Sequence, residues 1–104
     1  MPYFLVLLHP VAGAADPPDH EPFVDWLHSL NLVVLGGELD PPALGAEAAY
    51  VLSCGSLADA RELVASDPLV SSGCMRADLV EWQLVGLNPA AVESELLWRP
   101  GDGA

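Results

Sequence analysis

The sequence is short of positive charge. It has no lysine, and its only strong cations are Arg61, Arg76 and Arg99, against fifteen acidic residues that give a formal net charge of −12. A surface of that charge repels nucleic-acid phosphates and anionic lipid headgroups, so we expect neither nucleic acid nor membrane as a partner. Two explanations of the acid excess stay open: a general effect on solubility or composition, and recognition of a cationic substrate or partner.

Cysteine is equally scarce, and long apolar runs are missing. Cys54 and Cys74 have no metal or redox spacing such as C-x-x-C, so we expect two buried small side chains in a reducing, cytoplasmic compartment. The apolar residues 3–8 superficially resemble a secretory signal, but no cationic segment precedes them and Pro10 interrupts the pattern. No run approaches the roughly 20 apolar residues that span a bilayer.

What the chain does have is apolar content. A length of 104 residues is the size of one domain, and 52% of the residues are hydrophobic, which is more than a single small core needs to bury. We therefore expect one fold, part of whose apolar surface meets a partner.

The first half of the chain predicts a strand, a helix and a second strand. Residues 3–9 are continuously apolar, as in a strand that is buried on both faces. Apolar residues at helical spacing over 19–30, with Asp19 as N-cap, predict a helix. Residues 32–35 form a second strand that ends at Gly36-Gly37, and residues 40–45 form a loop.

The second half repeats the pattern. Residues 48–54 predict a third strand, and Ser56-Leu-Ala-Asp59 has the form of a capping box that opens a helix over 57–66. Residues 74–85 alternate, but the apolar phase changes at Leu79-Val80, which predicts a bulge or sharp bend there.

The chain divides into a domain of residues 1–85 and a C-terminal extension of residues 86–104. Asn88-Pro89 is typical of an N-cap followed by a first-turn proline, so we expect a short helix from there to about Trp98. We expect residues 99–104 to fray.

The order β-α-β-β-α-β predicts an α+β, ferredoxin-like fold with an antiparallel four-stranded sheet and two helices on one face. The other face would be bare and apolar, and exposing several hundred Å² of it is unfavourable at roughly 25 cal/mol per Å². A homodimer that stacks sheet on sheet would cover it, leaving a barrel-like sandwich with clefts for small molecules. Assembly beyond two copies stays open.

Three histidines are candidates for chemistry. His28 falls opposite the apolar stripe of its helix, which indicates a solvated surface residue. His9 ends the first strand beside Pro10, where it has a structural role or lines a ligand cleft. His20 lies in the first turn of the first helix at the edge of the stripe, where the helix N-terminus and partial burial both favour the neutral imidazole that a general base needs.

Two further segments allow two interpretations each. Asp67 is either an N-cap for a new turn at Pro68 or a carboxylate that holds His20 in one tautomer, and the two roles can coexist. Gly36-Gly37 with Glu38 is either a glycine turn or a place where a ligand approaches the backbone closely.

These features together resemble the YCII-related (YciI-like) family. The resemblance spans about residues 3–85 and rests on His20 in the first helix, the Leu35-Gly-Gly37 end of the second strand, the helix from Ser56, Asp67-Pro-Leu-Val70 and Gly73. It implies a ferredoxin-like subunit, a homodimer of the dimeric α/β-barrel type, and a catalytic pair of His20 and Asp67 in a cleft. The chain departs from the family at Glu38, where proline is common.

Three kinds of function follow. In the first, His20 transfers a proton on a small molecule in a lyase or isomerase reaction while Asp67 orients it, with no cofactor or metal. In the second, the cleft binds a small molecule without transforming it. In the third, histidines bind a metal, but their spacing is not one typical of zinc. We expect ligand contacts from Gly36, Gly37, Glu38 and His9 in either of the first two cases.

Overall fold

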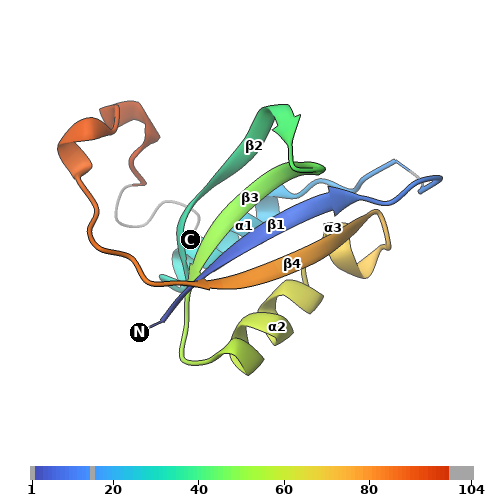
Figure 1. Cartoon of the computed structure of the whole chain (residues 1–104), viewed down its shortest axis with the longest axis horizontal. Coiled ribbons are helices and arrows are strands. Elements are labelled where there is room, and N and C mark those ends of the chain that lie inside the picture. The colour runs from blue at the N-terminus through green and yellow to red at the C-terminus, as the bar shows by residue number, and fades with distance from the viewer. Residues whose placement is uncertain (1, 15, 99–104) are drawn as a thin grey trace.

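The computed structural model describes residues 2–14 and 16–98, and Figure 1 shows its arrangement of one sheet with helices. The predicted order of strands and helices is confirmed. In chain order the elements are β1 (Tyr3–Pro10), α1 (Glu21–Ser29), β2 (Val33–Ala43), β3 (Ala46–Ser53), α2 (Leu57–Ala65), α3 (Pro68–Ser71), β4 (Met75–Trp82) and the 3-10 turns η1 (Pro89–Ala91) and η2 (Ser94–Leu96).

The four strands form one antiparallel sheet in the order β2-β3-β1-β4 (Figure 1). The first and third strands are central, as the split β-α-β topology requires. Phe4, Val6 and Leu8 of β1 are fully buried and alternate with half-buried residues, so every second side chain of β1 enters the core. They pack with Phe23 and Leu27 of α1 beneath the sheet. The ferredoxin-like α+β fold is thus confirmed.

Helix α1 begins later than the sequence predicts. Asp19 is not the N-cap; that position belongs to His20, and the helix starts at Glu21. Asp19 still accepts a hydrogen bond from the Glu21 N–H, at 3.1 Å, so its carboxylate supports the helix start from one residue further out. His20 makes no capping bond, which leaves its imidazole available for other contacts.

Helices α2 and α3 begin as the sequence predicts. The Asp59 N–H donates to the Ser56 side-chain oxygen at 3.1 Å, and the Leu69 N–H donates to Asp67 Oδ1 at 2.9 Å. Each cap satisfies a backbone donor that the first helical turn leaves unpaired.

Strand β2 does not end at Gly36-Gly37, and the loop predicted over residues 40–45 is wrong. The strand continues to Ala43, with irregular pairing after Glu38, and only Leu44 and Gly45, both at positive φ, form the turn into β3. Pro41 and Pro42 are tolerated because β2 is an edge strand, on which a residue without an N–H removes no bond from a central ladder.

Strand β4 contains no bulge. Its pairing with β1 runs without a shift from Met75 to Trp82, so the change of apolar phase has another cause. Leu79 packs against the core, whereas Val80 and Trp82 point to the opposite face of the sheet and stay 52% and 46% exposed. Both faces of β4 carry apolar side chains near Leu79 and Val80, so the apolar pattern does not require a change of register.

The C-terminal extension lacks the predicted helix through Trp98. Asn88 does act as an N-cap, accepting a hydrogen bond from the Ala90 N–H at 3.1 Å, but only the 3-10 turns η1 and η2 follow. The predicted fraying of residues 99–104 falls outside the described residues. No helix among those described is both long and apolar enough to cross a bilayer.

Candidate active site

The site is built around the carboxylate of Asp67, which is fully buried. Three polar groups converge on it: the Leu69 N–H donates to Oδ1 at 2.9 Å, the Tyr50 hydroxyl donates to Oδ2 at 2.9 Å, and His20 Nε2 lies 2.8 Å from the same Oδ2. A buried charge is tolerated only when hydrogen bonds compensate for its lost hydration. The Leu69 and Tyr50 donors, one on each oxygen, stabilise the ionised carboxylate.

The local sequence explains how Asp67 comes to be buried. Asp67 caps α3, and Pro68 at the first helical position has no N–H to satisfy. The two interpretations of Asp67 therefore coexist: Oδ1 caps the turn, while Oδ2 faces His20 and Tyr50.

His20 lies at the junction between the proline-rich loop and α1. Its side chain is 22% exposed, as the predicted position at the edge of the apolar stripe requires. The ring stacks on Phe23, with ring centroids 5.7 Å apart, and lies 5.8 Å from the Tyr50 ring. These contacts hold the imidazole in one orientation, with Nε2 directed at Asp67.

The hydrogen-bond partners fix the tautomer of the neutral imidazole. An ionised carboxylate only accepts hydrogen bonds, so His20 Nε2 must carry the proton that Asp67 binds. The lone pair of the neutral ring then lies on Nδ1. This is the orienting arrangement of an acid–base pair, in which the carboxylate positions the base and stabilises its protonated form.

Tyr50 belongs to the site, although no role there was predicted for it. Burial, reinforced by the charge of Asp67 and the hydrogen bond to it, raises the pKa of Tyr50 far above its ordinary value, so the phenol stays a neutral donor. Gly36 is the sequence feature that could have indicated the place of Tyr50, because it pairs with Tyr50 across β2 and β3. A Cβ on Gly36 would lie 2.8 Å from Tyr50 Cβ, so the glycine makes room for the tyrosine.

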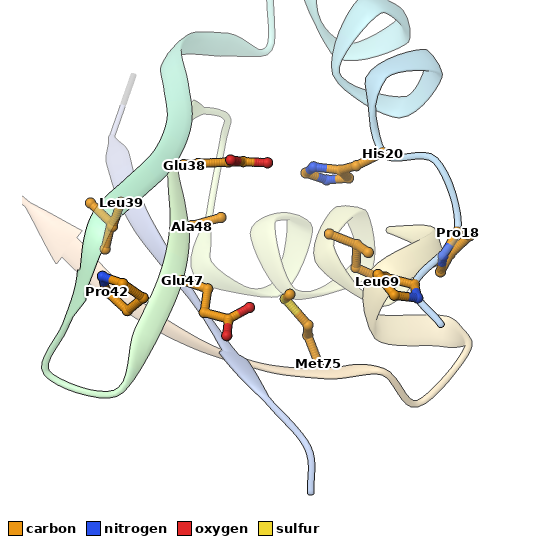
Figure 2. Close-up of a pocket in the computed structure, with 10 residues that line it drawn as sticks. Pro18, His20, Glu38, Leu39, Pro42, Glu47, Ala48, Leu69 and Met75 are labelled. Atoms are coloured by element: carbon orange, nitrogen blue, oxygen red, sulfur yellow. The ribbon is translucent and has the colours of Figure 1, made fainter. Parts of the chain in front are cut away.

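His20 opens onto a pocket of about 370 Å³ between β2, β3, α3 and the loop before α1. Figure 2 shows the His20 imidazole and the Glu38 carboxylate pointing toward each other across it, with Glu47 and Met75 on a third side. A second hollow of about 360 Å³ shares His20 and Glu38 and extends along β2 and β3. Its lining includes Gly36 and Gly37.

The predicted ligand residues therefore fall into two groups. Gly36, Gly37 and Glu38 lie beside His20, whereas His9 does not. His9 is on the bare face of the sheet, with Nε2 2.9 Å from Asp78 Oδ2, and Asp78 also binds Arg76 at 2.7 Å. We accordingly leave His9 out of the proposed ligand site.

The structure also tests the predictions for His28, for metal binding and for the two cysteines. His28 is not fully solvated as predicted, because its ring stacks on Trp98 with centroids 4.9 Å apart. Within residues 2–14 and 16–98, no three His, Cys, Asp or Glu side chains gather where they could hold a metal ion. Cys54 and Cys74 are both buried, as predicted.

The fold and the site define a ferredoxin-like α+β protein with a buried carboxylate–imidazole pair at the wall of a pocket. Among solved structures, the chain is similar to 5-chloro-2-hydroxyhydroquinone dehydrochlorinase from Burkholderia phenoliruptrix AC1100 in complex with 2,5-dihydroxybenzoquinone. The TM-score is 0.54 at 15% identity, over 78% of this chain and 93% of that one. At this identity the likeness establishes the shared fold. No family model matches the chain, and no curated protein matches it.

Proposed function

We propose that the protein is a small-molecule enzyme of the lyase or isomerase kind, in which His20 is the general base and Asp67 its orienting partner. The observation that carries the proposal is the 2.8 Å contact between His20 Nε2 and the fully buried Asp67 Oδ2, at the edge of a pocket that a small molecule can enter. The dehydrochlorinase with the same fold supports it, since that name denotes elimination chemistry on a small ring.

The chemistry follows from the tautomer. His20 Nδ1 accepts a proton from a carbon of the ligand, whose C–H electron pair stays on the ligand, and Asp67 stabilises the resulting imidazolium. An isomerase returns that proton to another carbon, whereas a lyase expels a leaving group instead. A positioned base contributes about 10² to 10⁴ in rate.

The pocket restricts the charge of the ligand. Glu38 and Glu47 line it, together with apolar side chains that include Leu69 and Met75, and neither Arg61 nor Arg76 does. Carboxylates repel an anion and attract a cation or a hydrogen-bond donor. A neutral or amine-bearing small ring is the ligand class that this lining favours.

The family relationship and the assembly are part of the same proposal. A YCII-related protein would combine this fold with His20 and Asp67, and it would form a homodimer through the bare face of the sheet. The half-exposed Val80 and Trp82 of β4 on that face support the homodimer, because a second copy would remove both side chains from water.

Hydrogen exchange in D₂O tests the proposal without knowledge of the natural substrate. Neutral and amine-bearing cyclic ketones are incubated with the protein, and deuterium at carbon is followed by NMR. A proton-transfer enzyme incorporates deuterium, and His20→Gln loses that activity. His28→Gln is the matched control: it removes a histidine of α1 that lines neither hollow beside His20, and it leaves the exchange rate unchanged. Equal rates in the wild type and His20→Gln would contradict the base assignment.

A binding module that does not transform its ligand is the alternative, and one observation favours it. Removing a proton from carbon leaves negative charge on the ligand, which enzymes stabilise with donors or cations. The pocket instead presents Glu38 and Glu47 near His20. Ketones or amines that perturb the His20 resonances but exchange no deuterium would establish the module.

A further inference from the structure

Tyr50 and His20 share a single oxygen of Asp67. The Tyr50 hydroxyl lies 2.9 Å from Oδ2 and His20 Nε2 lies 2.8 Å from it, while the Leu69 N–H occupies Oδ1. The donors come from three places in the chain, namely β3, the residue before α1, and α3. With both oxygens engaged, the carboxylate cannot rotate without breaking at least one of these bonds.

Sharing an oxygen has consequences for each donor. A carboxylate oxygen offers two main lone-pair directions, so a phenol on one of them leaves the other for the imidazole. The phenol also withdraws part of the charge that would otherwise act on the Nε2–H. Both the direction and the strength of the His20–Asp67 bond therefore depend on the Tyr50 hydroxyl.

We propose that Tyr50 is a positioning residue, whose hydroxyl acts through Asp67 to orient the His20 imidazole and to limit the strength of its hydrogen bond. This deepens the proposed function and rests on it only for the catalytic consequence. The sequence supports the placement of this phenol, because Gly36 clears the space that the Tyr50 backbone and Cβ occupy. The ring also contacts both His20 and Phe23, so its position is fixed independently of the hydroxyl.

A purely structural tyrosine is the competing explanation. Tyr50 is 2% exposed and belongs to the apolar core, which a phenylalanine would fill almost as well. In that case the hydroxyl serves only as a hydrogen-bond donor to Asp67. Its removal then changes the stability of the protein but not the hydrogen bond between His20 and Asp67. The two explanations differ in what happens to the Nε2–H proton.

The test uses the ligand-free protein and proton NMR of the His20 Nε2–H, assigned by its loss in His20→Gln. In Tyr50→Phe the resonance moves downfield, because Oδ2 now accepts one bond fewer and binds the imidazole N–H more closely. Tyr3→Phe is the matched control, since Tyr3 is the only other tyrosine and makes no contact with Asp67. The same spectra, by their dispersion, report whether the variant is folded.

A second measurement keeps the inference falsifiable if Tyr50→Phe fails to fold. In the Tyr3→Phe background, fluorotyrosine labels Tyr50 alone, and its more acidic phenol is a stronger donor. The Nε2–H resonance then moves upfield, opposite to the effect of phenylalanine. An unchanged resonance in both proteins overturns the role of Tyr50, even if His20 proves catalytic. Opposite shifts in a protein that exchanges no deuterium leave the inference standing and contradict only the proposed catalysis.

Discussion

Gly36 and Tyr50 face each other across β2 and β3 so closely that a Cβ on the glycine would lie 2.8 Å from Tyr50 Cβ. Contacts that short do not persist, so a larger residue at position 36 must displace one of the two strands. Through Tyr50, the same displacement reaches the Asp67 carboxylate and His20.

The first prediction concerns this close approach. Gly36→Ala lowers the free energy of unfolding by about 1–3 kcal/mol, the usual effect of overpacking. Gly37→Ala is the control, because a Cβ there meets nothing within 4 Å. Urea unfolding of both variants measures the difference, and equal stabilities would show that β2 can move away from Tyr50 without penalty.

Asp67 gives the second prediction. Asp67→Ala removes a helix cap and leaves the buried Tyr50 hydroxyl without its acceptor, so we expect a loss of roughly 2–4 kcal/mol. Asp19→Ala removes an exposed carboxylate that also accepts a backbone N–H, and it lowers stability by less than about 1 kcal/mol. If the two variants unfold at the same urea concentration, the Asp67 network contributes little to stability.

Alkaline pH gives the third prediction. The raised pKa of Tyr50 means that the folded protein keeps a proton that the unfolded chain releases near pH 10. The contribution of Tyr50 to stability is therefore complete below about pH 10 and is lost as the pH rises above it. Above about pH 10, the free energy of unfolding of the wild type should therefore fall more steeply with pH than that of Tyr50→Phe. The difference between the two slopes is up to about 1.4 kcal/mol per pH unit.

The control for this pH dependence is Tyr3→Phe, which keeps the buried phenol. Its stability should follow the steep wild-type slope above pH 10. Parallel curves for the wild type and Tyr50→Phe would mean that Tyr50 ionises in the folded protein as readily as in the unfolded chain.

The bare face of the sheet gives the fourth prediction. We expect a homodimer in solution, and Val80→Glu should dissociate it by placing a charge on a half-exposed apolar position of that face. Leu44→Glu adds the same charge at the β2–β3 turn, where Leu44 is 93% exposed, and leaves the dimer intact. Sedimentation analysis of the wild type, Val80→Glu and Leu44→Glu measures the oligomeric state of each. A wild type that stays monomeric at micromolar concentration would rule the dimer out.

Local patterns in the sequence were sufficient for much of the fold and for part of the site. Side-chain caps at Ser56 and Asp67 act within three residues, so their spacing predicts them directly. The pairing of His20 with Asp67 joins residues 47 positions apart, and the sequence suggested it only as one of two interpretations, through family resemblance and the titration chemistry of histidine.

The features that could not be predicted from the sequence depend on which strands are neighbours in the sheet. Pro41 and Pro42 suggested a loop, because nothing local tells that β2 is an edge strand. The phase change at Val80 suggested a bulge, because one apolar stripe per strand was assumed, whereas β4 has apolar side chains on both faces near Leu79 and Val80. Tyr50 was missed because its partner Gly36 is opposite it only in the β2–β3 register.

The chemistry proposed for His20 requires that Asp67 hold the neutral ring with its proton on Nε2 and its lone pair on Nδ1. Nitrogen-15 NMR of histidine-labelled protein measures this directly, since protonated and unprotonated ring nitrogens resonate far apart. We expect a single Nε2–H tautomer for His20 in the wild type, and the loss of that preference in Asp67→Ala. A wild-type His20 ring that carries its proton on Nδ1, or divides it evenly between the two nitrogens, would show that Asp67 does not set the tautomer.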